Sequence, residues 1–186
     1  MIQDSGNWSE RAVRDAVLSG DMAAWRAWYA QHFDQLADYA RWRCGGLLDL
    51  ADDVIQETWL TAVRRLRTFD PDKGPFGAWL RGIAANAARN CIRARRRESK
   101  RSRPLRPGED LPAATPDPVA VEKAERSALA LAALPDHYEA VLRAKYLDQL
   151  TVEQIAVQSN TSPKAVESLL TRARQAFRGA YEIHDG

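Results

Sequence analysis

Apolar residues recur at spacings of three and four along most of this chain, and no stretch keeps the strict alternation of a β-strand. Such periodicity is typical of amphipathic helices, so the chain is predicted to be all-α. The pattern is interrupted between residues 98 and 118, which hold five of the nine prolines. A proline-rich stretch without an apolar period indicates an extended or flexible linker. We therefore predict two small helical domains joined by a flexible proline-rich linker.

The linker divides the chain into parts whose boundaries follow from the pattern. Two consecutive glycines, Gly45 and Gly46, predict the C-terminal cap of the first long helix. The apolar stripe of that helix, and so its expected buried face, consists of Met22, Trp25, Tyr29, Phe33, Leu36 and Ala40. The expected parts are an N-terminal tail (1–19), a first helical domain (20–97), the linker (98–118), a second helical domain (119–180) and a C-terminal tail (181–186). Helices are predicted at 21–43, 50–67 and 75–97, and then at 119–134, 136–147, 152–159 and 163–180.

Composition excludes several classes of protein. The chain has 186 residues, of which 45% are hydrophobic and 8% aromatic, enough for packed cores. Its longest uninterrupted apolar run, 128–134, is far shorter than the ~20 residues of a membrane span. The N-terminus lacks the basic and then apolar stretch of a secretory signal, and two cysteines cannot form a disulfide framework. We expect a cytoplasmic protein without membrane insertion.

The net charge of +2 conceals a strongly basic segment. Residues 64–106 carry 14 basic and 3 acidic side chains, a net charge of +11, whereas the segments before and after it carry −5 and −4. A basic block between acidic flanks is typical of a polyanion site, with nucleic acid as the first candidate. A solvated basic face without a partner is the alternative.

The end of the chain has the pattern of a helix-turn-helix. Thr151 and Gln154 have the spacing of a capping box, and Ser162-Pro163 is a typical start of a second helix after a short turn. In such a motif the second helix enters the major groove of DNA. A helical hairpin that packs only on protein is the alternative. The outward residues of the second helix are Lys164, Ala165, Glu167, Ser168, Thr171 and Arg172.

The predicted helix 75–97 has two different faces. One is apolar and includes Phe76, Trp79 and Leu80, so it is expected to lie in the core. The other combines small residues with Asn86 and several arginines and contains no acidic residue. Amides can read base edges and arginines bind phosphates, so this face is predicted to contact nucleic acid.

The preceding helix, 50–67, has acidic first turns and more apolar surface than one buried stripe requires. This combination favours a docking face for a basic protein partner. A metal site is a weaker alternative, because no histidine accompanies the carboxylates. The sequence contains no phosphate-binding glycine loop, nucleophile elbow or His-Glu-x-x-His motif, so no catalytic residues, metal or cofactor are expected and an enzyme is disfavoured.

Two groups of motifs together carry a family resemblance. The first is Asp52-Asp53-Val54-Ile55-Gln56-Glu57-Thr58-Trp59, Phe69-Asp70-Pro71, Phe76-x-x-Trp79-Leu80-x-x-Ile83-Ala84-x-Asn86 and Arg95-Arg96-Arg97. The second is Leu134-Pro135, Ile155-Ala156, Val166-Glu167-Ser168 and Arg172-Ala173-Arg174. In this order they resemble regions 2 and 4 of the extracytoplasmic-function (ECF) group of bacterial sigma-70 factors, over roughly residues 20–97 and 120–180.

The resemblance implies a sigma factor that binds core RNA polymerase through the clamp helices of its largest subunit and through the flap. It also implies recognition of −10 and −35 promoter elements, help in promoter melting, and an anti-sigma factor as a further partner. The residues implied for polymerase binding are Asp52, Asp53, Gln56, Glu57 and Leu60. Those implied for the −10 element are Phe76, Trp79, Asn86, Arg89, Asn90, Arg93 and Arg96, with the loop 69–78 forming part of a base pocket. The arginines implied to follow the backbone are Arg89, Arg93, Arg95, Arg96 and Arg97. Those implied for the −35 element are Ser162, Lys164, Ala165, Glu167, Ser168, Thr171 and Arg172.

A second function class is an autonomous helix-turn-helix regulator whose first domain senses a signal or dimerises. It predicts specific duplex binding without polymerase, usually at a palindromic site. It does not explain why the most basic surface lies outside the helix-turn-helix.

Overall fold

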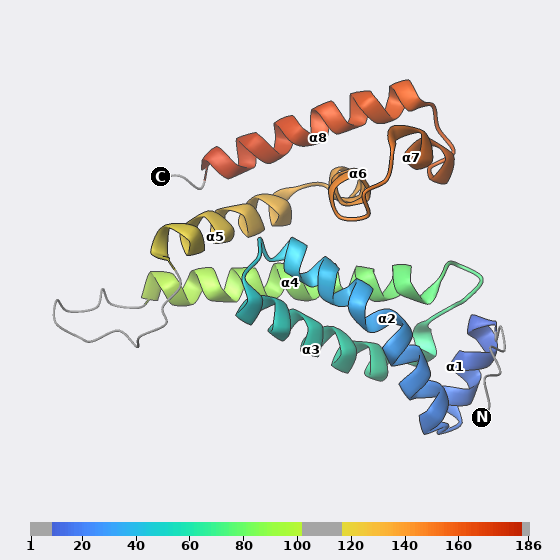
Figure 1. Ribbon diagram of the computed structural model, residues 1–186. Coiled ribbons are helices and arrows are strands. Elements are labelled where there is room, and N and C mark those ends of the chain that lie inside the picture. The colour runs from blue at the N-terminus through green and yellow to red at the C-terminus, as the bar shows by residue number, and fades with distance from the viewer. Residues whose placement is uncertain (1–8, 102–116, 184–186) are drawn as a thin grey trace.

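In the computed structural model, residues 9–101 and 117–183 are described, and within these ranges all regular structure is helical (Figure 1). No helix of this part of the chain is long and apolar enough to cross a membrane. The all-α prediction is confirmed, whereas residues 102–116 of the expected linker lie outside the described ranges. The helices are α1 (Glu10–Leu18), α2 (Met22–Arg43), α3 (Leu48–Arg65), the 3-10 helix η1 (Leu66–Thr68), α4 (Phe76–Arg101), α5 (Pro118–Ala133), α6 (Asp136–Tyr146), α7 (Val152–Gln158) and α8 (Pro163–Ile183).

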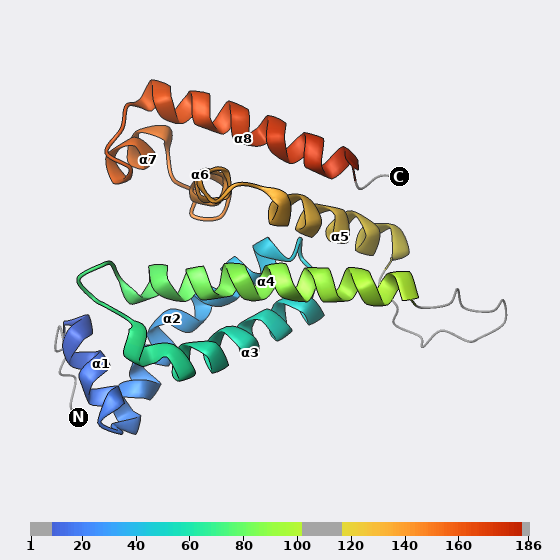
Figure 2. The ribbon, with the colours of Figure 1, turned by 180° about the vertical axis from the view of Figure 1, so that it is seen from behind.

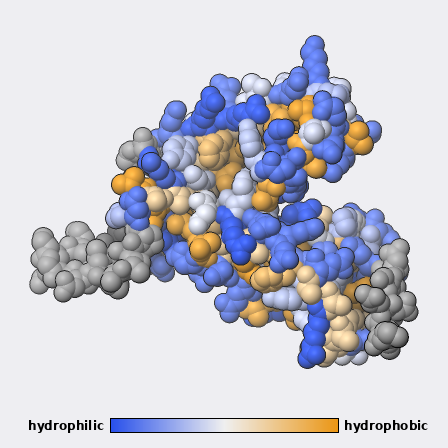
Figure 3. Space-filling model, viewed as in Figure 1, coloured by the Kyte–Doolittle hydropathy of each residue, from blue (hydrophilic) through white to orange (hydrophobic). Residues whose placement is uncertain are grey.

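The helices form two layers. The first domain, α1 to α4, lies on one side, and the second domain, α5 to α8, lies over α2 and α4 (Figures 1 and 2). In the space-filling view a recess separates the layers on the side where α7 lies (Figure 3). On that side a polar recess of about 420 Å³ is lined by residues of α2, α4, α6 and α7.

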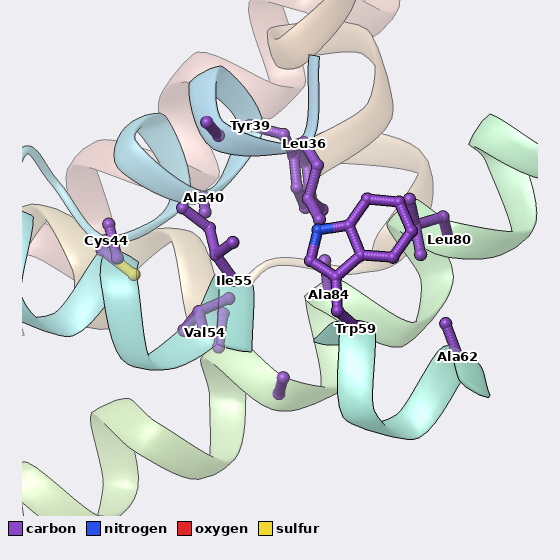
Figure 4. Packing of buried hydrophobic residues seen from close by; sticks show 14 of the residues in the cluster. Leu36, Tyr39, Ala40, Cys44, Val54, Ile55, Trp59, Ala62, Leu80 and Ala84 are labelled. Carbon is purple, nitrogen blue, oxygen red and sulfur yellow. The ribbon is translucent and has the colours of Figure 1, made fainter. Parts of the chain in front are cut away.

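The core of the first domain is built where α2, α3 and α4 meet. Side chains such as Leu36 from α2, Trp59 from α3 and Leu80 from α4 point toward one another (Figure 4). An aromatic cluster closes one end, with Phe76 stacked on Trp28 at a centroid distance of 3.9 Å. The start of α4 is therefore fixed by aromatic packing as well as by its backbone.

The predicted buried stripe of α2 was wrong in part. Met22 is 59% exposed and Tyr29 37% exposed, and the buried side chains include Trp28 and His32 instead. The cause is that α2 contacts α1, α3, α4 and α5, so it needs apolar residues on more than one face. Periodicity within α2 could not show which apolar face is the more deeply buried.

The helix ends follow the local signals closely. Asp21 caps α2 by accepting from the backbone N–H groups of Ala23 and Ala24, and the predicted capping box of Thr151 and Gln154 is present. Gly45 and Gly46 both have positive φ, as the predicted cap requires. Most predicted boundaries lie within two residues of those observed. The larger differences are that the expected N-terminal tail contains α1, α4 continues to residue 101, and α8 reaches residue 183 within the expected C-terminal tail.

The two domains share a packed interface. Ala128 of α5 belongs to the first core, and Leu131, one turn later, belongs to the second. Arg43 of α2 is 1% exposed and lies near the carboxylate of Glu139 on α6. Burial raises the pKa of Glu139, while the charge of Arg43 opposes that rise by favouring the carboxylate. The interface therefore combines apolar packing with the buried guanidinium of Arg43 and the half-buried carboxylate of Glu139.

Gly45 lies directly against the backbone of α5, and this close contact gives a stability prediction. Its φ is +66°, and a Cβ there would lie 2.2 Å from the backbone oxygen of Ala124 on α5, whereas a Cβ on Gly46 (φ +92°) would meet nothing within 4 Å. We expect Gly46→Ala to lower the free energy of unfolding by about 1–2 kcal/mol, the cost of left-handed backbone. Gly45→Ala should cost a further ~1–3 kcal/mol, because α5 must move. Equal losses in urea denaturation would contradict the close contact.

Candidate nucleic-acid and protein interfaces

A groove of about 430 Å³ runs between α2 and α3 on the outer face of the first domain. We call it the α2–α3 groove. Three of the residues expected to contact polymerase, Asp52, Gln56 and Leu60, lie in its wall, and Leu60 is 44% exposed. Asp53 and Glu57 are exposed on α3 outside it, and their charges help to raise the pKa of Cys91 on α4, after burial as the main cause. The other lining residues are Trp25, Tyr29, Phe33, Ile55, Trp59 and Val63.

The aromatic wall of this groove was missed by the sequence analysis, which assigned Trp25, Tyr29 and Phe33 to the core. In the structure the ring of Trp59 lies 4.5 Å from that of Tyr29 and 5.8 Å from that of Trp25, measured between centroids. The available signal was the excess of apolar residues on α2, which holds more of them than one stripe can bury. The groove therefore offers apolar surface beside carboxylates.

The predicted nucleic-acid face of α4 is present on the surface. Asn86, Asn90, Arg93 and Arg96 are exposed. Arg89 is half-buried; it donates to the side-chain oxygen of Asn86 at 3.1 Å and pairs with Asp136 of α6 at 2.6 Å. The packed second domain thus supplies an acidic partner to one residue of this face.

Arg95 does not share the environment of its neighbours. Its guanidinium pairs with Asp49 of α3 and with Glu125 of α5, and the bond to Arg95 lowers the pKa of Asp49. Arg96 and Arg97 are exposed. Of the five arginines expected to follow the nucleic-acid backbone, Arg95 is engaged between the two domains and Arg89 is paired with Asp136.

Phe76 and Trp79 pack against other aromatic side chains of the first domain. Phe76 is 0% exposed, so the prediction that it contacts DNA does not hold in this arrangement, and its ring fills the aromatic cluster instead. Trp79 is half-buried, with its ring centroid 5.4 Å from that of Phe69. Both residues therefore shape the start of α4 and the loop before it.

The helix-turn-helix consists of α7 and α8. Ile155 of α7 and Val166 and Leu170 of α8 are buried, and the turn between the helices contains Asn160 with a positive φ of 48°. The hydroxyl of Ser162 accepts from the backbone N–H of Ala165 and so caps α8. All the residues expected at the −35 element are exposed: Ser162, Lys164, Ala165, Glu167, Ser168, Thr171 and Arg172.

No group of three or more histidine, cysteine or acidic side chains suited to a metal ion occurs within the residues that the structure describes. Cys44 is buried, and burial raises its pKa to about 12, which keeps it a thiol at neutral pH. Cys91 is half-buried, and burial raises its pKa too. Burial therefore disfavours the thiolate form of both cysteines.

Two family descriptions match the chain in order: sigma-70 region 2 over residues 28–98, and sigma-70 region 4 over residues 127–177. The first contains α4 and the α2–α3 groove, and the second contains the helix-turn-helix. The order and spacing of the two matches agree with the two domains.

Related proteins agree with these matches. The ECF RNA polymerase sigma factor SigE of Mycolicibacterium smegmatis is 28% identical over 193 residues, which cover 98% of this chain and 72% of SigE. The ECF RNA polymerase sigma factor SigM of Bacillus subtilis is 31% identical over 133 residues, covering 71% of this chain and 80% of SigM. A solved structure of CnrH in complex with the cytosolic domain of CnrY has a TM-score of 0.51 and 26% identity, covering 95% of this chain and 99% of CnrH. The chain belongs to the ECF group of the sigma-70 family of RNA polymerase sigma factors.

Proposed function

We propose that this sigma factor docks on core RNA polymerase through the α2–α3 groove, reads a −10 element with α4 and a −35 element with α8, and aids promoter melting. The observation that carries the proposal is the exposed face of α4, where two asparagines and several arginines occur without an acidic residue. Family membership supports a regulator of transcription initiation that binds DNA, and we propose no catalytic role. The site of action is the cytoplasm, where polymerase and chromosome meet.

The chemistry of melting explains the composition of α4. Flipping a base out of a duplex costs a few kcal/mol of stacking and pairing free energy. Contacts between a protein pocket and the flipped base have to offset this cost. Asn86 is exposed and can bond a base edge, while Arg93 and Arg96 offer charge to the adjoining single strand. Arg89 joins them when it exchanges Asp136 for a phosphate.

Recognition of the −35 element is assigned to the first turns of α8. Lys164 and Arg172 can contact phosphate or guanine, and Glu167 can accept from the amino group of cytosine. Arg172 bonds the backbone oxygen of Ser168 at 3.4 Å, a long contact that DNA can replace. The short turn after α7 is the device that presents this helix to the major groove.

Docking on polymerase is assigned to α3 and the α2–α3 groove. Leu60 and Val63 are exposed apolar residues at its edge, and Asp53 and Glu57 continue the acidic surface beside it. Such a surface fits a basic, amphipathic helical partner, as the clamp helices of the largest subunit would be. The flap of polymerase is the partner proposed for the second domain.

An anti-sigma factor is the further partner we propose. A mainly apolar groove of about 710 Å³ lies between the domains, with Trp42 and Leu131 in its floor and Arg41 and Arg178 among its lining residues. An acidic amphipathic helix fits this combination of apolar floor and arginines. Because both domains line the groove, such a helix would hold them in the packed arrangement.

Charge reversal on α3 tests the docking surface. We expect Asp53→Lys with Glu57→Lys to weaken binding to core polymerase by about tenfold or more, because like charges would then face a basic partner. Transcript starts on genomic DNA fragments, directed by the purified chain with core polymerase, should be lost in parallel. The control is Glu122→Lys with Glu182→Lys, an equal charge change at exposed sites of the second domain. Specific duplex binding by the chain alone, without discrete starts, would favour the autonomous regulator.

Substitution of Asn86 separates recruitment from melting. We expect Asn86→Ala to slow open-complex formation about tenfold, the value of a good base contact, while leaving the affinity of holoenzyme for duplex promoter nearly unchanged. Permanganate footprinting and gel shift measure the two steps. The control is Gln175→Ala, which changes an exposed amide side chain on α8, far in sequence from the α4 face. Equal loss in both assays would contradict the role of Asn86 in the base pocket.

The ion pair between Arg89 and Asp136 should lower the affinity of the free protein for single-stranded DNA. Asp136→Asn removes the acidic partner and is expected to tighten binding of single-stranded DNA by up to about fivefold, the range of a partly exposed ion pair. Glu122→Gln makes the same change of net charge at an exposed site of α5 and should have little effect. Fluorescence anisotropy at low salt checks this. An equal gain in both variants would show a general charge effect only.

A further inference from the structure

Helix α1 lies before residue 28, where the match to sigma-70 region 2 begins, and it replaces an expected tail. It packs beside η1 and the start of α2, next to the loop that connects η1 to α4 (Figure 1). That loop runs from Phe69 to Phe76, both of which are buried. Side chains of α1 reach the loop at its two ends and in its middle.

The strongest of these contacts is made by Glu10. Both of its carboxylate oxygens accept from the backbone N–H of Phe76, at 3.0 and 2.9 Å. This N–H belongs to the first residue of α4, where the helix has unsatisfied donors and a positive dipole end. The cap of α4 is thus a carboxylate that comes from 66 positions earlier in the chain.

Two arginines of α1 hold the rest of the loop. Arg14 donates to the backbone oxygen of Phe69 at 3.1 Å and also pairs with Asp15, and its side chain is only 19% exposed. Arg11 pairs with Asp72 at 2.5 Å, but both side chains are largely exposed, so this pair contributes less. Glu10 and Arg14 therefore fix the two points where the loop leaves the core.

Within the loop, the remaining bonds are local. The side chain of Asp70 accepts from the backbone N–H of Asp72, and its backbone oxygen accepts from that of Lys73. Gly74 has a φ of +151° and provides the turn into α4. These bonds shape the loop, whereas the side chains of Glu10 and Arg14 tie it to α1, a separate element.

We propose that α1 is a positioning element for −10 recognition, and that Glu10 and Arg14 are its positioning residues. The inference rests on the proposed function, together with the expectation from the family resemblance that the loop 69–78 forms part of the base pocket. A pocket that is held in its binding conformation before DNA arrives avoids the cost of ordering it on binding. Glu10 and Arg14 do not contact DNA; they act by fixing the backbone at Phe76 and Phe69.

The experiment uses holoenzyme assembled with the full chain, and a single-stranded oligonucleotide bearing the −10 element from the mapped transcript starts. A second oligonucleotide carries one changed base in that element. We expect Glu10→Ala and Arg14→Ala each to weaken binding of the matched oligonucleotide by about tenfold, as the loss of a charge-assisted bond implies. The ratio of matched to mismatched affinity should fall, while affinity for core polymerase stays within about twofold.

Matched controls are Asp34→Ala and Arg26→Ala, which remove exposed charges of the same sign from α2. Glu10→Gln keeps an acceptor oxygen but not the charge, so it should give an intermediate ratio and replaces Glu10→Ala if that variant fails to fold. An unchanged ratio in Glu10→Gln and Arg14→Ala would overturn the proposal, as would a loss of core affinity equal to the loss of oligonucleotide binding. Failure of the proposed function is distinguished by the wild-type holoenzyme, which would then not prefer the matched oligonucleotide.

Discussion

The packing of α4 against α2 and α3 is the constraint on which the other features depend. Its buried face carries large side chains near its start, Phe76 and Leu80, and alanines in its middle, Ala84, Ala87 and Ala88, which allow close approach of the neighbouring helices. Burial of this face holds the opposite face, with Asn86 and the arginines, on the surface. The hydrophobic effect thus orients polar groups that contribute nothing to the core themselves. The same burial, through Phe76, fixes where the loop before α4 must end.

Local signals predicted the helix-turn-helix almost completely, because its caps and turn depend on neighbours in sequence. Thr151 needs only Gln154, and Ser162 needs only the backbone of Ala165. The all-α class and the positive φ values at Gly45 and Gly46 follow from equally short-range rules. The residue set on the surface of α8 could be derived in the same way, since a single amphipathic stripe decides it.

Tertiary contacts decided what the sequence pattern could not. On α2 two apolar faces compete, and the neighbours of that helix determine that Trp28 is buried while Tyr29 lines a groove. Phe76 matches a motif shared with sigma factors, but the motif alone does not show that the ring of Phe76 is fully buried. The cap of α4 by Glu10 spans 66 positions, and no local rule pairs such distant residues. These are the features where long-range packing overrides propensity.

The charge pattern of the chain has two consequences in the packed arrangement. Asp136 and Glu125 of the second domain pair with Arg89 and Arg95, so part of the basic segment is neutralised within the molecule. Phosphates compete with these carboxylates for the same guanidinium groups, and the competition is weaker where the arginine is paired twice. Arg95, held from both domains, is therefore the more durable link, whereas Arg89 has a single, mostly exposed acidic partner. Nucleic acid would displace that partner first, so we expect any release of α6 from α4 to begin at the face that we propose to read the −10 element.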